Sequence, residues 1–268
     1  MLRFWLLLTL SVLCLPSTLF AKTLVLVHGF QSNGMSWRMS GVTPVLQQVG
    51  WRDGGNFLLT SMGSYNPMPH LGAGAENVFY TVDLPSRAPV ALQASLLDTH
   101  LQQIYQHRQE PLVLVGHSAG GVVARHWLVT TPSVPVDTLI TIATPHLGSL
   151  LANIAERTTD SMLGTMADKT GLGKWTKDAE NVYRDLRREK PGRFLYWLNH
   201  QPHPPLRYVS IVRDNQPRPD QFDVAVPRYS QNMNNVFALH GVSEVVAVKG
   251  EHFTGVADGY ALARLLAQ

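Results

Sequence analysis

The chain has 268 residues, of which 45% are apolar and 15% are charged. This length suits one large α/β domain, and the composition is typical of a folded globular chain and excludes the charge-rich make-up of disordered proteins. The net charge of +3 is too small over this length to predict a nucleic-acid-binding surface. We therefore expect no nucleic-acid partner.

The N-terminal segment has the features of an export signal. Arg3 carries a positive charge, an apolar run follows at residues 4–20, and Ala21 offers a small residue for cleavage. We expect residues 1–21 to be a signal peptide. Residues 22–268 would then be the exported domain, either periplasmic or secreted.

Two alternatives to a cleaved leader are weaker. An uncleaved membrane anchor would use a run that is near the lower length limit for a span and that contains Pro16. Acylation of Cys14 would need a small residue where Leu13 stands. Because Cys14 is the only cysteine, the exported chain would contain no disulfide.

Continuous aliphatic runs alternate with helical patterns along the rest of the chain. Such runs are typical of strands that are buried on both faces, and the alternation predicts a mostly parallel α/β sheet flanked by helices. The predicted strands are residues 23–27, 112–115, 138–143, 208–212 and 244–248, and the predicted helices are residues 88–108, 119–131 and 256–267.

Two segments interrupt this alternation. Residues 61–76 are rich in Gly, Pro, Ser and Asn, which predicts an irregular loop beside the site. Residues 149–205 are too long for an ordinary connection and predict an inserted helical cap. Its aromatic cluster, at residues 194–197, belongs either to a mobile lid or to surface helices whose aromatics pack into the core.

The strongest chemical signal is the sequence Gly-His-Ser-Ala-Gly at residues 116–120, between a predicted strand and a predicted helix. A serine in such a sharp turn is presented as a nucleophile, and Gly116 and Gly120 prevent clashes with the neighbouring backbone. A serine hydroxyl needs a histidine to accept its proton and an acid to orient that histidine. We therefore predict Ser118 as the nucleophile.

The chain order narrows the choice of base. Where a serine occupies this kind of turn, the acid and then the histidine follow it in the sequence. With an acid after the strand at residues 208–212, this order leaves His240 and His252 as candidate bases. His252 follows the strand at residues 244–248, whose carboxyl end would deliver it to the active edge of the sheet. His240 precedes that strand and would enter at the opposite edge. We predict His252 as the base.

The acid should follow the strand at residues 208–212. Asp214, Asp220 and Asp223 all qualify by position. Asp223 is our first choice, because the hydrophobic residues after it would fix its loop. Asp214 is the second choice, and the unused residues would be turn-forming aspartates.

The reaction also needs donors for an oxyanion, ideally fixed backbone N–H groups. Ala119 follows the nucleophile at the start of a predicted helix and supplies one. The loop after the first predicted strand should supply the second, from the N–H of Phe30. His28 and Gly29 would then shape this loop without transferring a proton.

These motifs together resemble the α/β-hydrolase superfamily. The similar segments are residues 24–30, 114–125, 141–149 and 223–227, together with His252, and they cover nearly the whole exported chain. The sequence looks most like bacterial triacylglycerol lipases and the related GPI-inositol-deacylase-like lipases. The resemblance implies the same nucleophile, acid, base and oxyanion donors, and it implies that His146 lies in a structural loop.

The sequence departs from that resemblance at one feature. Some bacterial lipases hold a calcium ion and a disulfide near the acid and base loops, but this chain lacks the cysteines for the bridge. Asp258, six residues beyond His252, does not match the aspartate of those calcium sites. We therefore expect no metal and no other cofactor.

The predicted function is that of an exported serine hydrolase. Its substrates would be carboxylic esters, especially lipid-like ones, and it could contact a membrane or lipid interface peripherally. An acyltransferase is the nearest alternative, because an alcohol can intercept the same acyl-enzyme in place of water. A non-catalytic lipid-binding protein on this fold is the alternative from another class.

Overall fold

The computed structural model describes residues 22–149, 152, 181–214 and 226–267. The predicted leader, most of the predicted cap and two candidate acids, Asp220 and Asp223, lie outside these residues.

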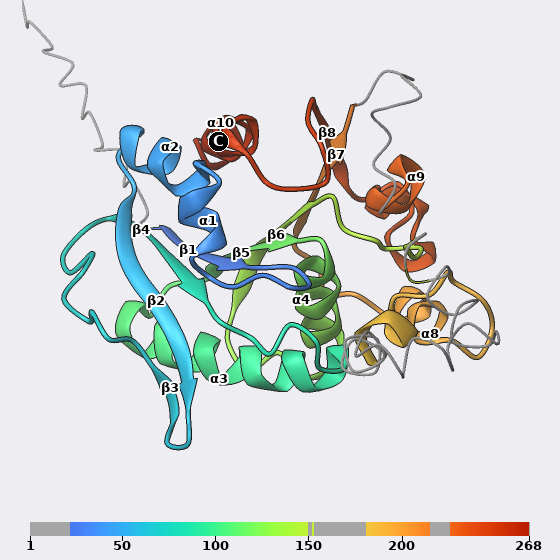
Figure 1. Cartoon of the computed structure of the whole chain (residues 1–268), viewed down its shortest axis with the longest axis horizontal. Helices are drawn as coiled ribbons and strands as arrows, with labels where there is room; N and C mark the ends of the chain where they lie inside the picture. The colour runs from blue at the N-terminus through green and yellow to red at the C-terminus, as the bar shows by residue number, and fades with distance from the viewer. Residues whose placement is uncertain (1–21, 150–151, 153–180, 215–225, 268) are drawn as a thin grey trace, which may run out of the picture.

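The described chain forms an eight-stranded sheet in the order β3-β2-β4-β1-β5-β6-β7-β8 (Figure 1). Neighbouring strands are parallel, except that β3 runs antiparallel to β2. This confirms the predicted fold class. The strands are β1 (Lys22–Val27), β2 (Arg52–Thr60), β3 (Gly63–Tyr65), β4 (Asn77–Val82), β5 (Leu112–His117), β6 (Val136–Ile142), β7 (Arg207–Arg213) and β8 (Glu244–Val248).

Helices cover both faces of the sheet (Figure 1). One face carries α1 (Ser36–Met39), α2 (Val42–Gln48) and α10 (Val256–Leu266), and the other carries α3 (Val90–Arg108) and α4 (Ala119–Thr130). Toward the β7 side of the molecule lie α8 (Phe194–His200), α9 (Arg228–Gln231) and the 3₁₀ turns η1 (Met233–Asn235) and η2 (Phe237–Leu239).

The core explains why the strands are continuously apolar. In β1, Leu24 and Leu26 pack with the α2 and α10 side chains, whereas Val25 and Val27 pack with those of α3 and α4. Successive side chains of a strand point to opposite faces, so a strand covered on both faces needs apolar residues at every position. Two hydrophobic layers result, one on each side of the sheet.

The sequence analysis missed β2 and β4 and misplaced residues 61–76. That segment contains β3, the outer edge strand, which β2, β4 and β1 separate from β5. Apart from β3 the segment is irregular, as predicted, but it lies at the outer edge of the sheet, so the prediction that it lies beside the site is wrong. β2 shows no clear hydrophobic pattern, because it contains polar residues and its register shifts between Asp53 and Asn56.

The aromatic residues of α8 pack against the body of the domain. Phe194 and Trp197 contact the ring of His126 on α4, with ring centroids 5.3 and 5.7 Å apart. His200 stacks on Phe237 of η2 at 4.7 Å. Phe194 packs partly buried against the core, whereas Trp197 is 43% exposed, so the second alternative applies to Phe194 and not to Trp197.

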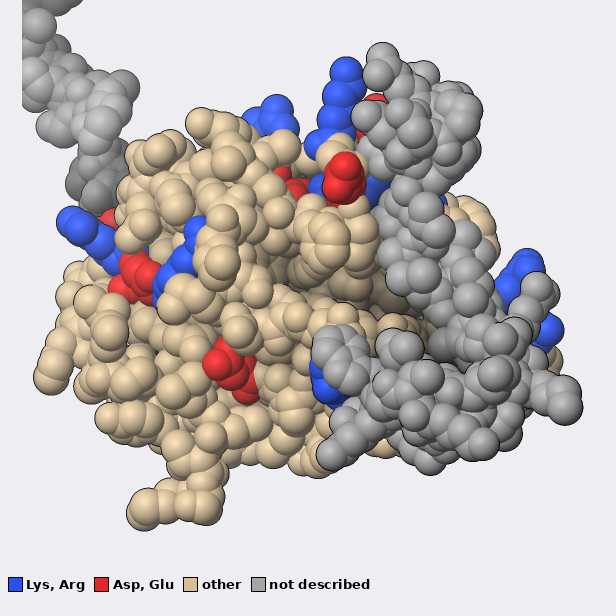
Figure 2. All heavy atoms as spheres, viewed as in Figure 1, with Lys and Arg blue, Asp and Glu red and all other residues tan. Residues whose placement is uncertain are grey.

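No helix within the described ranges is long and apolar enough to cross a bilayer. On the face seen in Figure 2, basic and acidic side chains are scattered among uncharged residues over the part that the structure describes.

Candidate active site

Ser118 lies in the sharp turn between β5 and α4, in a conformation that a side-chain-bearing residue rarely adopts. Its backbone angles are φ 50° and ψ −126°. The Ser118 N–H donates to the carbonyl of Ile142 on β6 at 2.9 Å, and the Ser118 carbonyl accepts from the Gly121 N–H at 3.1 Å. Such strain persists only where the surrounding structure enforces it, as at reactive sites.

The two glycines of the motif are required by close backbone approach. A Cβ on Gly116 would lie 2.4 Å from the Cα of Gly121, and one on Gly120 would lie 2.3 Å from the carbonyl oxygen of His28. Neither contact can be relieved by moving a flexible side chain. The glycines therefore allow α4 to begin against β5 and β1, which holds Ser118 at the carboxyl edge of the sheet.

The structure brings His252, and not His240, to the serine. The Nε2 atom of His252 lies 2.9 Å from Ser118 Oγ, within hydrogen-bond distance for proton transfer. His252 reaches this position from the connection between β8 and α10. His240 is exposed, and its Nδ1 contacts the carbonyl of Asn234 at 3.0 Å.

His117, which the chain order excludes as the base, contacts the backbone of His252. Its Nε2 lies 2.9 Å from the His252 carbonyl oxygen. A carbonyl can only accept, so His117 donates this hydrogen bond. The residue before Ser118 thus holds the main chain of His252, a contact that the sequence analysis did not predict.

The predicted oxyanion loop adjoins Ser118. A Cβ on Gly29 would lie 2.9 Å from the Cβ of Ser118, so only glycine fits there, and Phe30 follows directly. Ala119 is the first residue of α4, where helix N–H groups lack intrahelical partners. Both predicted donor residues therefore flank Ser118, at the loop after β1 and at the helix start.

His28 orients this loop as a neutral side chain. Leu84 N–H donates to His28 Nε2 at 3.0 Å, so Nδ1 carries the proton and donates to the Gly29 carbonyl at 2.9 Å. Burial lowers the pKa of His28 and favours this neutral form. In a trans peptide the C=O and N–H point in opposite directions, so fixing the Gly29 carbonyl also fixes the Phe30 N–H.

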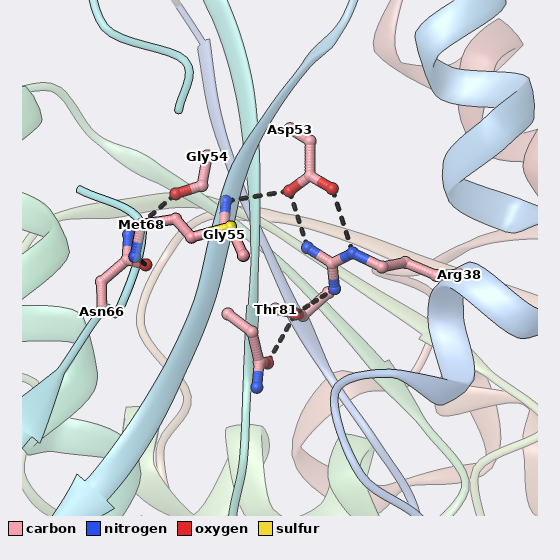
Figure 3. A network of polar contacts seen from close by, with 8 residues as sticks. Arg38, Asp53, Gly54, Gly55, Asn66, Met68 and Thr81 are labelled. Carbon is pink, nitrogen blue, oxygen red and sulfur yellow. Dashed lines mark hydrogen bonds and ion pairs between the residues drawn. The ribbon is translucent and has the colours of Figure 1, made fainter. Parts of the chain in front are cut away.

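A polar network holds the segment that follows the predicted oxyanion loop (Figure 3). From α1, Arg38 donates two hydrogen bonds to Asp53, at 2.6 and 3.0 Å, and one to Thr81 at 2.7 Å. Thr81 then donates to Asn56, and the Gly34 N–H donates to Asp83 beyond β4. These bonds tie the connection between β1 and α2 to β2 and β4.

Of the three candidate acids, Asp214 is the one that lies within the described residues. The carboxylate of Asp214 accepts a hydrogen bond from Arg228 at 3.1 Å, and its side chain is 34% exposed. The Asp214 N–H donates to the carbonyl of Val248. The first choice, Asp223, and the third candidate, Asp220, lie outside the described residues, so Asp223 stays a prediction.

His146 lies in a buried polar cluster. Arg125 of α4, which is fully buried, donates to His146 Nδ1 at 3.0 Å and to Asn199 of α8 at 2.9 Å. Burial, and then the Arg125 charge, hold the pKa of His146 well below its usual value. These contacts give His146 the structural role that the resemblance implied. In the described part of the chain, no group of three or more His, Cys, Asp or Glu side chains could hold a metal ion.

Comparisons with known proteins show which fold this chain shares. Residues 73–170 match the family model described as a PGAP1-like alpha/beta domain. The mature form of the Bacillus licheniformis lipase BlEst2 superposes with a TM-score of 0.62 at 19% identity, over 92% of this chain and 91% of the lipase. The protein has the α/β-hydrolase fold. The resemblance stated from the sequence is thereby confirmed.

Other structures share the α/β-hydrolase fold of this protein. A bromoperoxidase from Bacillus anthracis matches with a TM-score of 0.53 at 15% identity, over 92% of this chain and 90% of that enzyme. A phospholipase from Legionella pneumophila matches with a TM-score of 0.54 at 13% identity, over 79% of this chain and 44% of the phospholipase. No curated protein matches the sequence.

Proposed function

We propose that the protein is a serine hydrolase that cleaves carboxylic esters through an acyl-enzyme. The observation that carries this proposal is the 2.9 Å contact between His252 Nε2 and Ser118 Oγ, with Ser118 in a strained turn at the start of a helix. A nucleophile within hydrogen-bond reach of a base is the arrangement that covalent acyl transfer needs. The lipase and the phospholipase that share the fold support a hydrolase.

In the proposed reaction, Ser118 Oγ attacks the ester carbonyl carbon while its proton passes to His252 Nε2. The new oxyanion accepts hydrogen bonds from the backbone N–H groups of Phe30 and Ala119. The intermediate collapses, the alcohol leaves with the proton from His252, and the acyl group stays on Ser118. A water molecule, deprotonated by His252, then releases the acid. The carboxylate of Asp223 would orient His252 and stabilise its charged form.

Lipid-like acyl groups are the proposed substrates because exposed apolar side chains lie next to the base and on the helix that follows it. Phe253, next to His252, is 76% exposed, and Val256 and Tyr260 on α10 are about half exposed. On the oxyanion side, the ring of Phe30 lies 5.0 Å from that of Tyr183. Apolar groups of this kind gain by contact with acyl chains. Peripheral contact with a lipid interface follows from the same surface and is part of the proposal.

The substrate class is tested with a series of acyl esters of increasing chain length. We expect kcat/KM to rise with acyl length by roughly fourfold per added CH₂ until the apolar surface is covered, since each buried CH₂ contributes about 0.8 kcal/mol. Rates are measured below and above the concentration at which each ester aggregates. A preference for short, soluble esters with no gain at the interface would exclude the lipase and leave an esterase.

The two leading candidate acids are separated by paired substitutions. Asp223→Asn should lower kcat by about 10⁴-fold, because an amide cannot stabilise the histidinium that forms in the transition state. Asp214→Asn should lower kcat less than tenfold, because the Asp214 carboxylate bonds to Arg228 and is partly exposed. Steady-state kinetics of both variants on one soluble ester decide between them. A larger loss at position 214 would reverse the assignment.

Hydrolysis, rather than acyl transfer to an alcohol, is a further part of the proposal. The motif at residues 116–120 does not distinguish water from an alcohol as the acceptor, so product analysis with added alcohols is needed. Free acid as the main product supports the hydrolase, and a new ester supports the acyltransferase.

Export is also part of the proposal. A native N-terminus at Lys22 supports cleavage after Ala21, and a retained leader contradicts it.

A further inference from the structure

A buried ion pair lies just beyond the base. Arg213 is the last residue of β7, and Asp258 lies in the first turn of α10. Two hydrogen bonds join them, Nη1 to Oδ1 at 2.6 Å and Nη2 to Oδ2 at 3.1 Å, and both side chains are only 2% exposed. A guanidinium and a carboxylate joined in this bidentate way have a fixed relative orientation.

Both members of the pair also bind the backbone that follows His252. Arg213 Nη2 donates to the carbonyl of Phe253 at 2.9 Å. Asp258 Oδ2 accepts from the N–H of Gly255 at 2.8 Å. With the His117 bond to the His252 carbonyl, three backbone groups between residues 252 and 255 are held by buried side chains.

Stability alone gives a weak reason for such a pair. Removing two charges from water is costly, and well-packed apolar residues of similar volume often stabilise a protein as well or better. An apolar pair could not, however, donate to the Phe253 carbonyl or accept from the Gly255 N–H. Beyond packing, the ion pair therefore fixes the orientation of the Phe253 carbonyl and the Gly255 N–H.

We propose that Arg213 and Asp258 are positioning residues for His252. By fixing the two backbone groups after the base, they hold its ring within reach of Ser118. This inference rests on the proposed function, in which His252 is the general base. It assigns a role to Arg213, which the sequence analysis did not single out, and to Asp258, which it considered only as an unmatched calcium ligand.

The test replaces the pair by apolar residues of similar size, Arg213→Met with Asp258→Leu, so that no unpaired charge is left buried. We expect a folded protein by circular dichroism, a 10- to 100-fold lower kcat on a short soluble ester, and a KM within about twofold of the parent value. A displacement of about 1 Å at a reacting group is enough for such a loss. Hydrogen exchange at the Gly255 amide should become faster.

A control removes a second bidentate pair that also joins β7 to its surroundings, at the other end of the strand and more exposed to solvent. Arg207, at the opposite end of β7, donates to Glu244 of β8 at 2.8 and 3.1 Å, and it also donates to the carbonyl of Leu265 in α10. The double variant Arg207→Met with Glu244→Leu should keep kcat within twofold and leave the Gly255 amide unchanged. A purely stabilising role at Arg213 would predict a parent-like kcat in its folded double variant as well.

The outcomes separate this inference from the proposed function. If the parent protein hydrolyses no ester and reacts with no fluorophosphonate, the proposed function fails, and the exchange rate at Gly255 still tests the hold on the loop. Parent-like kcat, or unchanged exchange, in the folded Arg213 and Asp258 double variant would overturn the inference. If that variant does not fold, Arg213→Lys is used. It keeps the charge but not the forked geometry, and the inference requires its kcat to fall at least fivefold.

Discussion

Replacing Ser118 by alanine should abolish ester turnover, with a loss in kcat of the order of 10⁶-fold. The hydroxyl is the group that forms the acyl-enzyme, so only the weak catalysis from substrate binding and the oxyanion donors would remain. The measurement is steady-state hydrolysis of a short soluble ester by the purified variant. Circular dichroism and the thermal unfolding midpoint should match the parent protein, because the substitution removes one hydroxyl and leaves the turn in place.

Turnover above one per cent of the parent rate in a folded Ser118→Ala protein would contradict the assignment. Ser149 is a suitable control, because it is also a buried serine and it belongs to the loop after β6. Ser149→Ala should keep kcat within a few-fold of the parent value. A loss at position 149 as large as that at position 118 would mean that the readout reports damage to the fold.

Replacing His252 by alanine should have a comparable effect, since a serine without its base is a poor nucleophile at neutral pH. We expect kcat to fall by about 10⁵- to 10⁶-fold. The rate of fluorophosphonate labelling should fall as well, because that reaction also uses the activated serine. Both rates are measured at one pH on protein that circular dichroism shows to be folded.

The matched control is His240→Ala. His240 is exposed, and within the described residues its side chain makes one hydrogen-bond contact, with the carbonyl of Asn234. Its replacement by alanine should therefore change kcat less than threefold. A severe effect at position 240 with a mild one at position 252 would reverse the choice of base. Equal effects would mean that neither histidine acts as the sole proton acceptor.

The contact between Ser118 and His252 was predictable because the positions of both residues depend on local patterns and on one general rule. The strand, the motif at residues 116–120 and the helix are contiguous, so the turn at Ser118 can be inferred without any distant contact. His252 follows a later strand, and the carboxyl ends of parallel strands share one edge of a sheet. That rule brings together two residues 134 positions apart.

Other contacts depended on details that a hydrophobic pattern does not contain. The bonds from Arg213 to Asp258 and Phe253 require the register of β7 against the first turn of α10, which is fixed by packing rather than by spacing. The partners of His28 and His117 are backbone carbonyls, which carry no sequence signal. For β4, by contrast, a signal existed in its valine and aromatic residues.

The central claim is that Ser118 is the residue that becomes acylated. Its most direct test is to treat the parent protein with a fluorophosphonate and to locate the adduct by peptide mass spectrometry. We expect one modified peptide, with the added mass on Ser118, and no adduct in the Ser118→Ala protein. An adduct on another residue, or a protein that hydrolyses esters while Ser118 stays unmodified, would contradict the account.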